Sequence, residues 1–231
     1  MTKSSAASTV PGDERVSLTM RAYSEIRRRI LDNELPAGSI MLEQELALLL
    51  DMSRTPVREA MIRLANEGMV EIRPRHGMRV LPISADDMQE IYQILTALES
   101  DAAARIADRG LPADAICELR TAVAAMDEAL ARDDLKAWAR ADERFHAVLI
   151  ETCGNRRLRD LVHQFWDQTY RVRMATLSLR PRPTESNRDH LALVEAIERR
   201  DAAAAARIHR EHRVRAGAML VDLLRRGPSQ L

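Results

Sequence analysis

Two short amphipathic segments joined by only two residues constrain the fold of this 231-residue chain most strongly. Each segment carries its apolar residues at helical spacing: Leu46, Leu49 and Leu50 in residues 43–50, and Val57, Met61 and Leu64 in the segment that begins at Ser53. Asp51 and Met52 leave room only for a tight turn between the two helices. The spacing therefore predicts a helix-turn-helix.

The flanking residues extend this helix pair into a larger unit. Before it, a further helix is indicated by apolar residues at helical spacing: Tyr23, Ile26, Ile30 and Leu31. After Gly68, residues 69–73 and 78–81 have the pattern of two short strands around a turn. Three helices followed by a hairpin are typical of a winged helix-turn-helix.

Arg54 and Arg58 lie four residues apart at the start of the second helix, so their side chains share one face. A guanidinium suits bidentate contact with guanine or with phosphate, which predicts a DNA-reading helix. The alternative for two such arginines is an ordinary solvated face. From Arg54 to Arg79 six arginines stand against three glutamates, although the formal net charge of the whole chain is zero. This local positive excess favours DNA binding.

The order of residues over about 20–82 resembles the GntR family of bacterial transcription regulators. The resemblance rests on five motifs: Leu35-Pro36-Ala37-Gly38, Glu45-Leu46-Ala47, Ser53-Arg54-Thr55-Pro56-Val57-Arg58-Glu59-Ala60, Leu64-Ala65-Asn66-Glu67-Gly68-Met69-Val70 and His76-Gly77. It implies that Arg54, Thr55 and Arg58 contact operator bases and phosphates, and that the wing, with His76 and Gly77, enters the minor groove. Two more DNA-contacting candidates follow from it: Ser53, which opens the longest motif, and Gln44, which stands where relatives often have a DNA-contacting arginine.

From Ser84 onward the chain has only helical patterns. Capping residues and breakers divide it into about six helices, over residues 84–108, about 112–132, 133–154, 155–179, 185–199 and 202–226. Their short connections predict an antiparallel bundle. The fold class is therefore mainly α, with a disordered tail over residues 1–15, a winged helix-turn-helix domain over 16–82 and an all-helical domain over 83–231.

The composition favours a soluble cytoplasmic protein. With 46% hydrophobic residues, the chain is long enough for two cores. No apolar run approaches the roughly 18 residues of a membrane span, and residues 1–15 lack the apolar centre of a signal peptide. We therefore expect no association with a membrane.

Four polar residues lie on the apolar stripes of the predicted bundle helices: Asp142, His146, His190 and His212. Burying three histidines and a carboxylate is costly unless they are paired or bind a metal. Histidine and aspartate ligands suit zinc, nickel, manganese or iron. For Asp142 and His146 alone, which are four residues apart, a helix salt bridge is the simpler explanation.

Residues 84–226 resemble the FCD domain, the all-helical effector domain of FadR-type GntR regulators, and six helices suit its vanillate-regulator-like subgroup. The resemblance rests on these motifs: Ala141-Asp142-Glu143-Arg144-Phe145-His146, Gly154-Asn155-Arg156-Arg157-Leu158, Asp189-His190, Ala196-Ile197, and Asp201 with His212. It implies that Asp142, His146, His190 and His212 bind a divalent metal, most simply zinc, which in turn holds a small carboxylate effector. A purely hydrogen-bonded cluster is the alternative.

Two further positions concern the effector. Four residues before Glu99 the family commonly has an arginine, where this chain has Leu95, which implies a less acidic or differently oriented effector. Arg173 offers a replacement charge, unless it lies exposed as most arginines do. His209, one turn before His212, is expected at the surface or just outside the metal site, and His163 has no motif support.

These observations predict a homodimeric, ligand-responsive repressor that binds a short pseudo-palindromic operator. The effector would favour one relative orientation of the two reading heads and so change operator affinity. Two alternatives remain. The cluster could be a hydrolytic metal centre with Glu143 as base, although Glu143 lies about 100° around the helix from Asp142 and the chain has no His-Glu-x-x-His motif. The other alternative is a DNA-binding protein without an effector.

Overall fold

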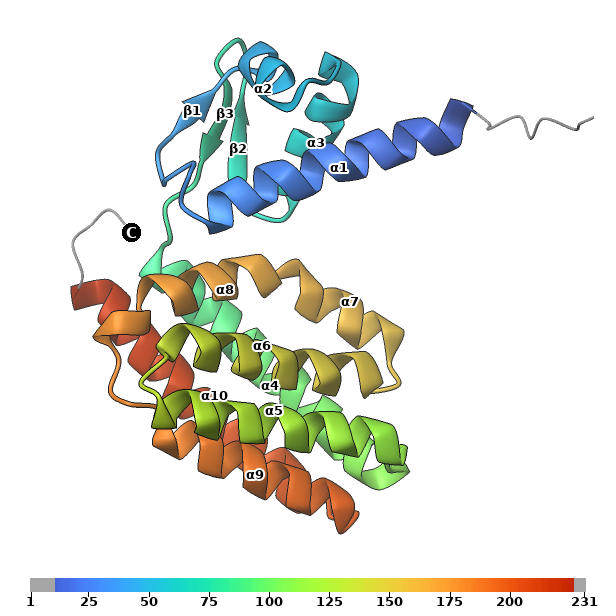
Figure 1. Cartoon of the computed structure of the whole chain (residues 1–231), viewed down its shortest axis with the longest axis vertical. Helices are drawn as coiled ribbons and strands as arrows, with labels where there is room; N and C mark the ends of the chain where they lie inside the picture. The colour runs from blue at the N-terminus through green and yellow to red at the C-terminus, as the bar shows by residue number, and fades with distance from the viewer. Residues whose placement is uncertain (1–10, 227–231) are drawn as a thin grey trace, which may run out of the picture. The chain divides into compact units, whose positions relative to one another are not determined.

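The computed structural model describes residues 11–226 and divides the chain into two compact units, one ending at Pro82 and the other beginning at Ile83 (Figure 1). The first helix, α1 (Pro11–Leu31), begins earlier than the sequence pattern indicates. Residues 11–15 of the expected tail are therefore helical, consistent with the preference of proline for the first position of a helix. Residues 1–10 of that tail lie outside the described residues.

The first unit confirms the winged helix-turn-helix. After α1 it contains β1 (Ile40–Met41), α2 (Glu43–Leu50), α3 (Arg54–Asn66), β2 (Val70–Arg73) and β3 (Gly77–Val80). The three strands form an antiparallel sheet in the order β1-β3-β2, with Val70 opposite Val80 and Ile40 opposite Arg79. The sequence analysis missed β1, because a strand of two residues is too short to show an alternating pattern.

The turn between α2 and α3 depends on Asp51. Its backbone is left-handed, with φ 50°, and its N–H donates to carbonyl oxygens of the last turn of α2. Asparagine and aspartate tolerate this conformation better than most residues, so the chain can end α2 and begin α3 two residues later. Below the turn, a single core joins α1, α2, α3 and the sheet through the buried side chains of Ile26, Leu46, Val57, Leu64 and Met78.

Gly77 determines the geometry of the wing. Its φ is +78°, and a Cβ at this position would lie 2.1 Å from the carbonyl oxygen of Met41 in β1. We expect Gly77→Ala to lower the free energy of unfolding of the first unit by about 2–3 kcal/mol, from left-handed strain together with this collision. Chemical denaturation of the full chain, monitored by probes in each unit, would measure the change.

Gly38 provides the matched control for this prediction. It also has a positive φ, +84°, but a Cβ there would meet no atom within 4 Å. Gly38→Ala should therefore cost only the strain, about 1 kcal/mol. Equal losses for the two variants would show that the contact with β1 does not constrain the wing.

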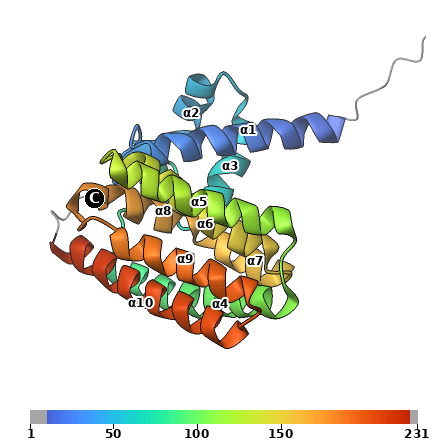
Figure 2. The same cartoon turned by 60° about the horizontal axis from the view of Figure 1, so that its bottom comes forward.

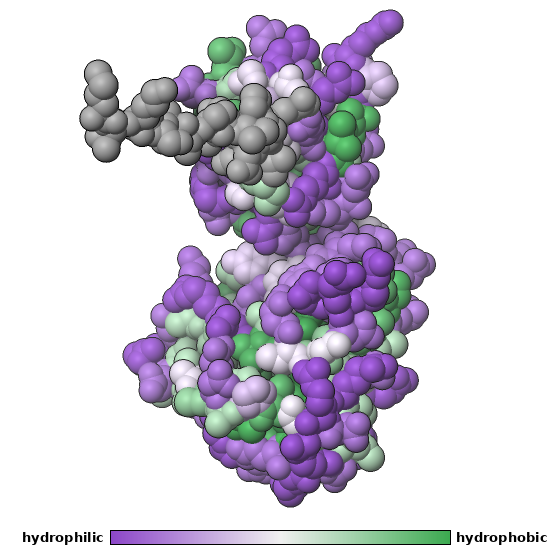
Figure 3. Space-filling view, turned by 90° about the vertical axis from the view of Figure 1, so that its right-hand side faces the viewer, coloured by the Kyte–Doolittle hydropathy of each residue, from purple (hydrophilic) through white to green (hydrophobic). Residues whose placement is uncertain are grey.

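The second unit is an antiparallel helical bundle (Figures 1 and 2). Its elements are α4 (Ala85–Arg109), α5 (Ala113–Ala131), α6 (Leu135–Thr152), α7 (Arg156–Gln164), α8 (Trp166–Ala175), the 3₁₀ turn η1 (Leu177–Leu179), α9 (Thr184–Glu198) and α10 (Ala202–Arg226). Helices α4 and α10 lie side by side along most of their length, as do α5 and α6. On the face shown in Figure 3, hydrophilic side chains cover most of this unit, with smaller hydrophobic areas between them.

The helix expected over residues 155–179 is wrong, because the structure divides it into α7, α8 and η1. The break at Phe165 contains no proline or glycine. There the backbone N–H of Phe165 donates to Val162, three residues back, which is 3₁₀ rather than α geometry. Without a proline or glycine at this point, the local sequence shows no signal for the break.

Side-chain caps confirm most of the other helix starts. Ser84, Asn155 and Asp201 each accept a hydrogen bond from a backbone N–H in the first turn of α4, α7 and α10. For α6 the cap is Asp134 instead of the expected Asp133, which has a positive φ of 54° just before it. Among residues 11–226, no helix combines the length and apolar character that a membrane-spanning segment needs.

Candidate functional site

The first candidate site is the exposed edge of α3. The buried face of this helix consists of Pro56, Val57, Ala60, Met61 and Leu64. Arg54, Thr55 and Arg58 therefore point away from the core, and all three are exposed, as are Ser53 before them and Gln44 on α2. The side chain of Arg54 is 68% exposed. This edge can meet an external partner without unfolding.

A groove of about 580 Å³ lies between α3 and the wing. It is lined by candidates from both elements, including Gln44, Arg54, Arg58 and Gly77. The structure adds two residues that motif reasoning did not single out, Arg73 and Arg75. His76 is exposed at the tip of the wing. Four guanidinium groups thus face one groove, an arrangement suited to the negative charge of DNA.

Glutamates form ion pairs with several arginines of this unit. Arg54 Nε donates to Glu43 at 2.8 Å, and both Arg73 and Arg79 pair with Glu71. These pairs are exposed and therefore weak. A phosphate group would compete with the carboxylates for the same guanidinium donors.

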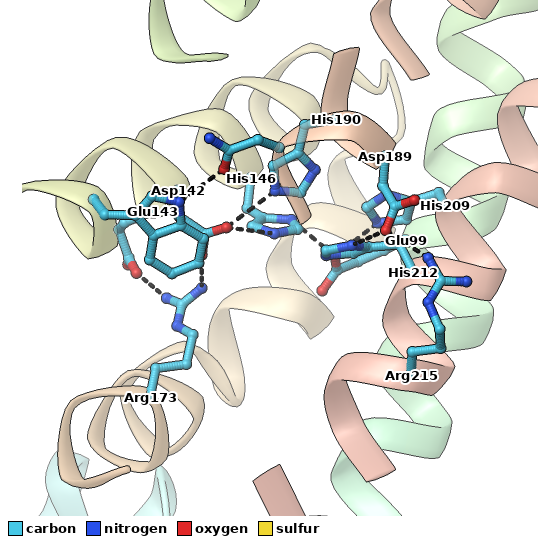
Figure 4. Close-up of polar contacts among 12 residues, drawn as sticks. Glu99, Asp142, Glu143, His146, Arg173, Asp189, His190, His209, His212 and Arg215 are labelled. Atoms are coloured by element: carbon cyan, nitrogen blue, oxygen red, sulfur yellow. Dashed lines mark hydrogen bonds and ion pairs between the residues drawn. The ribbon is translucent and has the colours of Figure 1, made fainter. Parts of the chain in front are cut away.

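The second candidate site lies inside the helical bundle. Asp142 and His146 come from α6, His190 from α9 and His212 from α10, and all four are buried. One nitrogen from each of the three histidines lies within 4.8 Å of the others. The Asp142 carboxylate is 3.0 Å from His190 Nε2 and 3.8 Å from His146 Nε2. The structure therefore brings together all four residues that the sequence suggested as metal ligands (Figure 4).

Burial controls the charge of this cluster. It lowers the pKa of His190 despite the opposing hydrogen bond to Asp142, and it lowers the pKa of His212 to about 3. Burial alone would raise the pKa of Asp142, but the hydrogen bond with His190 and the nearby charges hold that pKa below its usual range. At neutral pH the Asp142 carboxylate is therefore ionised, and His190 and His212 are neutral, the protonation states that bind metal.

The donors fit a divalent metal ion. His146 is buried, yet its Nδ1 has no hydrogen-bond partner among the described residues, and its Nε2 is too far from Asp142 to form one. A metal ion bound at Nε2 would supply the partner that Asp142 is too distant to provide for this buried nitrogen. One carboxylate and three imidazoles also match the ligand types of zinc and related metals.

Carboxylates outside the cluster contact two of its histidines. Asp189 accepts from His212 Nδ1 at 3.1 Å and is also paired with Arg215. Glu99, buried on α4, lies 3.5 Å from His146 Nδ1. In Figure 4 these side chains form a row from Arg173 and Asp142 at one end, through His146 and His190, to His212, Asp189 and Arg215 at the other. Such carboxylate–histidine contacts are typical of metal sites.

Sequence reasoning missed most of the network around Glu99. Oε2 of Glu99 is 3.1 Å from His209 Nε2, and Oε1 is 3.1 Å from Arg213 Nη2. His209 is therefore buried just outside the proposed ligand set, which agrees with the second of its two expected placements and not with the surface. The available signal was that Glu99 shares the apolar stripe of α4, while His209 and Arg213 lie four residues apart on α10. His163, in contrast, is exposed and pairs with Glu151.

The two effector positions also point into the bundle. Leu95 is buried and lines a cavity with Glu99, His146, Arg173 and Arg213. The Arg173 side chain is only 11% exposed, so the reading of Arg173 as an exposed arginine is wrong; its Nη1 lies 3.5 Å from Asp142, and it also pairs with Glu143. The cavity measures about 10 Å³, roughly the space of one water molecule. A metabolite could bind there only if these side chains move.

Glu143, the base of the hydrolase alternative, has other contacts. It accepts hydrogen bonds from Trp166 Nε1 and from Arg173 Nη2. A carboxylate held by a guanidinium is a poor general base, because the paired charge stabilises its ionised form. This geometry does not favour hydrolysis.

Comparisons with known families divide the chain in the same way as the structure. Residues 18–80 match the family described as "Bacterial regulatory proteins, gntR family", and residues 90–215 match the FCD domain. The two matches correspond to the winged helix-turn-helix unit and to the helical bundle.

Individual relatives agree with these matches. An uncharacterized HTH-type transcriptional regulator from the TAR-I ttuE-ttuC' intergenic region of Agrobacterium vitis is 47% identical over 131 residues, which are 56% of this chain and 77% of the relative. The HTH-type transcriptional repressor RspR of Escherichia coli is 28% identical over 84% of this chain and 85% of its own. Among solved structures, E. coli McbR/YncC has a TM-score of 0.75 at 21% identity, covering 89% of this chain and 97% of that one, and so shares the fold.

Proposed function

Since the chain belongs to the gntR family of bacterial regulatory proteins and carries an FCD domain, we propose that a small carboxylate bound at a metal site in its helical unit controls its affinity for an operator. Its family and its relatives are transcriptional regulators. The protein is likewise a DNA-binding transcriptional regulator and not an enzyme. The proposal concerns its control: the metal, the effector, the dimer and the direction of the response. Because its target is bacterial DNA, we place its action in the cytoplasm.

The DNA-reading surface is the edge of α3 together with the wing. Arg54 and Arg58 supply guanidinium groups for bases or phosphates, while Ser53, Thr55 and Gln44 supply shorter polar contacts beside them. His76 and the arginines of the wing reach the adjacent groove or backbone. Each phosphate contact releases counterions, so operator affinity should fall steeply with salt.

The metal site consists of Asp142, His146, His190 and His212. We propose zinc as the simplest occupant, with nickel, manganese and iron as chemically suitable alternatives. When bound, the metal supplies positive charge that attracts a carboxylate. Of the nearby residues, Arg173 could exchange its contact with Glu143 for an effector carboxylate, and Leu95 places an apolar side chain where the family commonly has an arginine.

Control of DNA binding follows from linkage between the two units. The effector changes operator affinity only to the extent that it binds the DNA-competent and DNA-incompetent arrangements with different free energies. We propose a homodimer, since two reading heads related by twofold symmetry match a pseudo-palindromic operator. Release from DNA on effector binding would make the protein a repressor, the activity for which the relative RspR is named.

The observation that carries the proposal is the buried cluster of three histidines and one carboxylate, in which His146 Nε2 lies 3.8 Å from Asp142, too far for a hydrogen bond. Native mass spectrometry of protein purified without chelator, combined with elemental analysis, tests it. We expect a dimer with one divalent metal ion per subunit. A metal-free protein that fails to take up added zinc would contradict the proposal, and the absence of any thermal shift with small carboxylates would favour an effector-independent DNA-binding protein.

A further inference from the structure

The buried carboxylate of Glu99 occupies a position with respect to His146 that the metal ligands do not explain. We infer that Glu99 is a positioning residue for the metal site: its carboxylate, 3.5 Å from His146 Nδ1, favours the ring proton on that nitrogen and so leaves the Nε2 lone pair of that ring for the metal. The inference rests on the proposed metal site. It adds a fifth residue, on a fourth helix, that contacts no metal itself.

The geometry of His146 supports this role. Its Nε2 lies on the side of Asp142, at 3.8 Å, and its Nδ1 lies on the side of Glu99, at 3.5 Å. The two ring nitrogens therefore face two different carboxylates, and only one of these carboxylates also contacts His190. A neutral imidazole carries one proton, and a carboxylate beside one nitrogen selects the tautomer with the proton there.

His212 shows the same arrangement within this cluster. Its Nδ1 is 3.1 Å from Asp189, so the Asp189 carboxylate orients that ring as Glu99 orients His146. Two of the three histidines thus have an outer carboxylate at Nδ1. Such partners fix ring orientation and raise the basicity of the ligand nitrogen.

A buried guanidinium and a second histidine hold the Glu99 carboxylate in place beside His146. Arg213 Nη2 is 3.1 Å from one carboxylate oxygen, and His209 Nε2 is 3.1 Å from the other. Arg213 is itself buried, so the pair is insulated from solvent.

A second metal ion at Glu99, His146 and His209 is the competing explanation, since their donor atoms also lie within 4.8 Å of one another. Arg213 argues against it. A guanidinium 3.1 Å from Oε1 of Glu99 would repel a divalent cation bound at the other oxygen of the same carboxylate. His146 would also have to bind a different metal through each ring nitrogen.

The test measures zinc affinity by competition with a chromophoric chelator, using the full chain. We expect Glu99→Gln to weaken zinc binding about 10- to 100-fold without changing the stoichiometry. Because Glu99→Gln leaves the buried charge of Arg213 unpaired, a second variant combines Glu99→Gln with Arg213→Met. It removes that charge and should show the same loss of zinc affinity. His209→Gln is the matched control: it alters the same network but retains Glu99 beside His146, and should stay within about 3-fold of wild type.

Long-range ¹H–¹⁵N spectra of the histidine rings report which ring nitrogen carries the proton. A merely structural role of Glu99 would leave this tautomer unchanged. In the zinc-loaded wild type, we expect His146 to carry its proton on Nδ1, and in Glu99→Gln we expect that signal to broaden or split between tautomers. If Glu99→Gln keeps the wild-type zinc affinity and the wild-type tautomer of His146, the inference about Glu99 is overturned while the proposed metal site stands. Loss of one zinc equivalent in His209→Gln would overturn it in favour of a second metal, and a wild-type protein that binds no zinc would overturn both the metal site and the inference.

Discussion

Replacing Arg58 with alanine should weaken operator binding roughly 10- to 100-fold while the protein stays folded. Arg58 is exposed on α3, lines the groove beside the wing and lies one turn from Arg54. A guanidinium that contacts a base or phosphate contributes about 1–3 kcal/mol. Fluorescence anisotropy on an operator selected from random DNA, at several salt concentrations, would measure the loss.

Arg63 offers the matched control on the same helix. Its guanidinium lies over the ring of Tyr23, 4.0 Å from the centroid, and pairs with Glu67, so it faces α1 and not the groove. Arg63→Ala should keep operator affinity and lose a little stability. Unchanged affinity in Arg58→Ala, or an equal loss in Arg63→Ala, would show that the edge of α3 does not read DNA.

The second large effect is expected from His190→Ala, which should reduce metal affinity at least about 100-fold. His190 is buried, lies 3.0 Å from Asp142 through Nε2 and stacks on Phe145 with ring centroids 4.2 Å apart. Removing it deletes one of four ligands and leaves Asp142 with only distant or weaker partners. Metal content and competitive zinc titration would measure the effect.

Stability provides an independent readout for this variant. A ligand that binds only the folded state raises the melting temperature, so zinc should stabilise the wild type and not His190→Ala. His163→Ala serves as the control, because His163 is 42% exposed and pairs with Glu151 away from the cluster. Full zinc stabilisation of His190→Ala would mean that the metal, if bound, lies elsewhere.

The winged helix-turn-helix could be predicted because its signals are local. The apolar residues recur at helical spacing in each segment, around Leu46 in the first and at Val57 and Leu64 in the second. The two residues between the segments permit only a tight turn. The structure confirms this part almost residue by residue. It departs where local signals are absent: the two-residue strand β1 follows from pairing with Arg79 and Met78 of β3, which are far away in the sequence.

The polar cluster was predictable only in part. Helical spacing placed Asp142 and His146 on one face, and resemblance to a family joined them to His190 and His212. Nothing in the spacing distinguished a buried Arg173 from an exposed one, or a buried His209 from a surface one. The helical period of 3.6 residues shows which side chains lie on the same face of one helix. It does not show which side chains of a neighbouring helix pack against that face.

The sequence thus determined the two units and the edge of α3, because these depend on spacing along one helix or on contiguous motifs, and with the family resemblance it also named the four candidate metal ligands. Only the tertiary structure decided the network around them. His146, His209 and Arg213 meet Glu99 because α4, α6 and α10 pack together, which brings residues 47 to 114 positions apart in the chain within about 3–4 Å. In the packed bundle, burial lowers the pKa of His190, His209 and His212, while hydrogen bonds and nearby charged groups hold the pKa of Asp142 and Glu99 below the usual range. Both effects depend on neighbouring helices, so no single segment contains them.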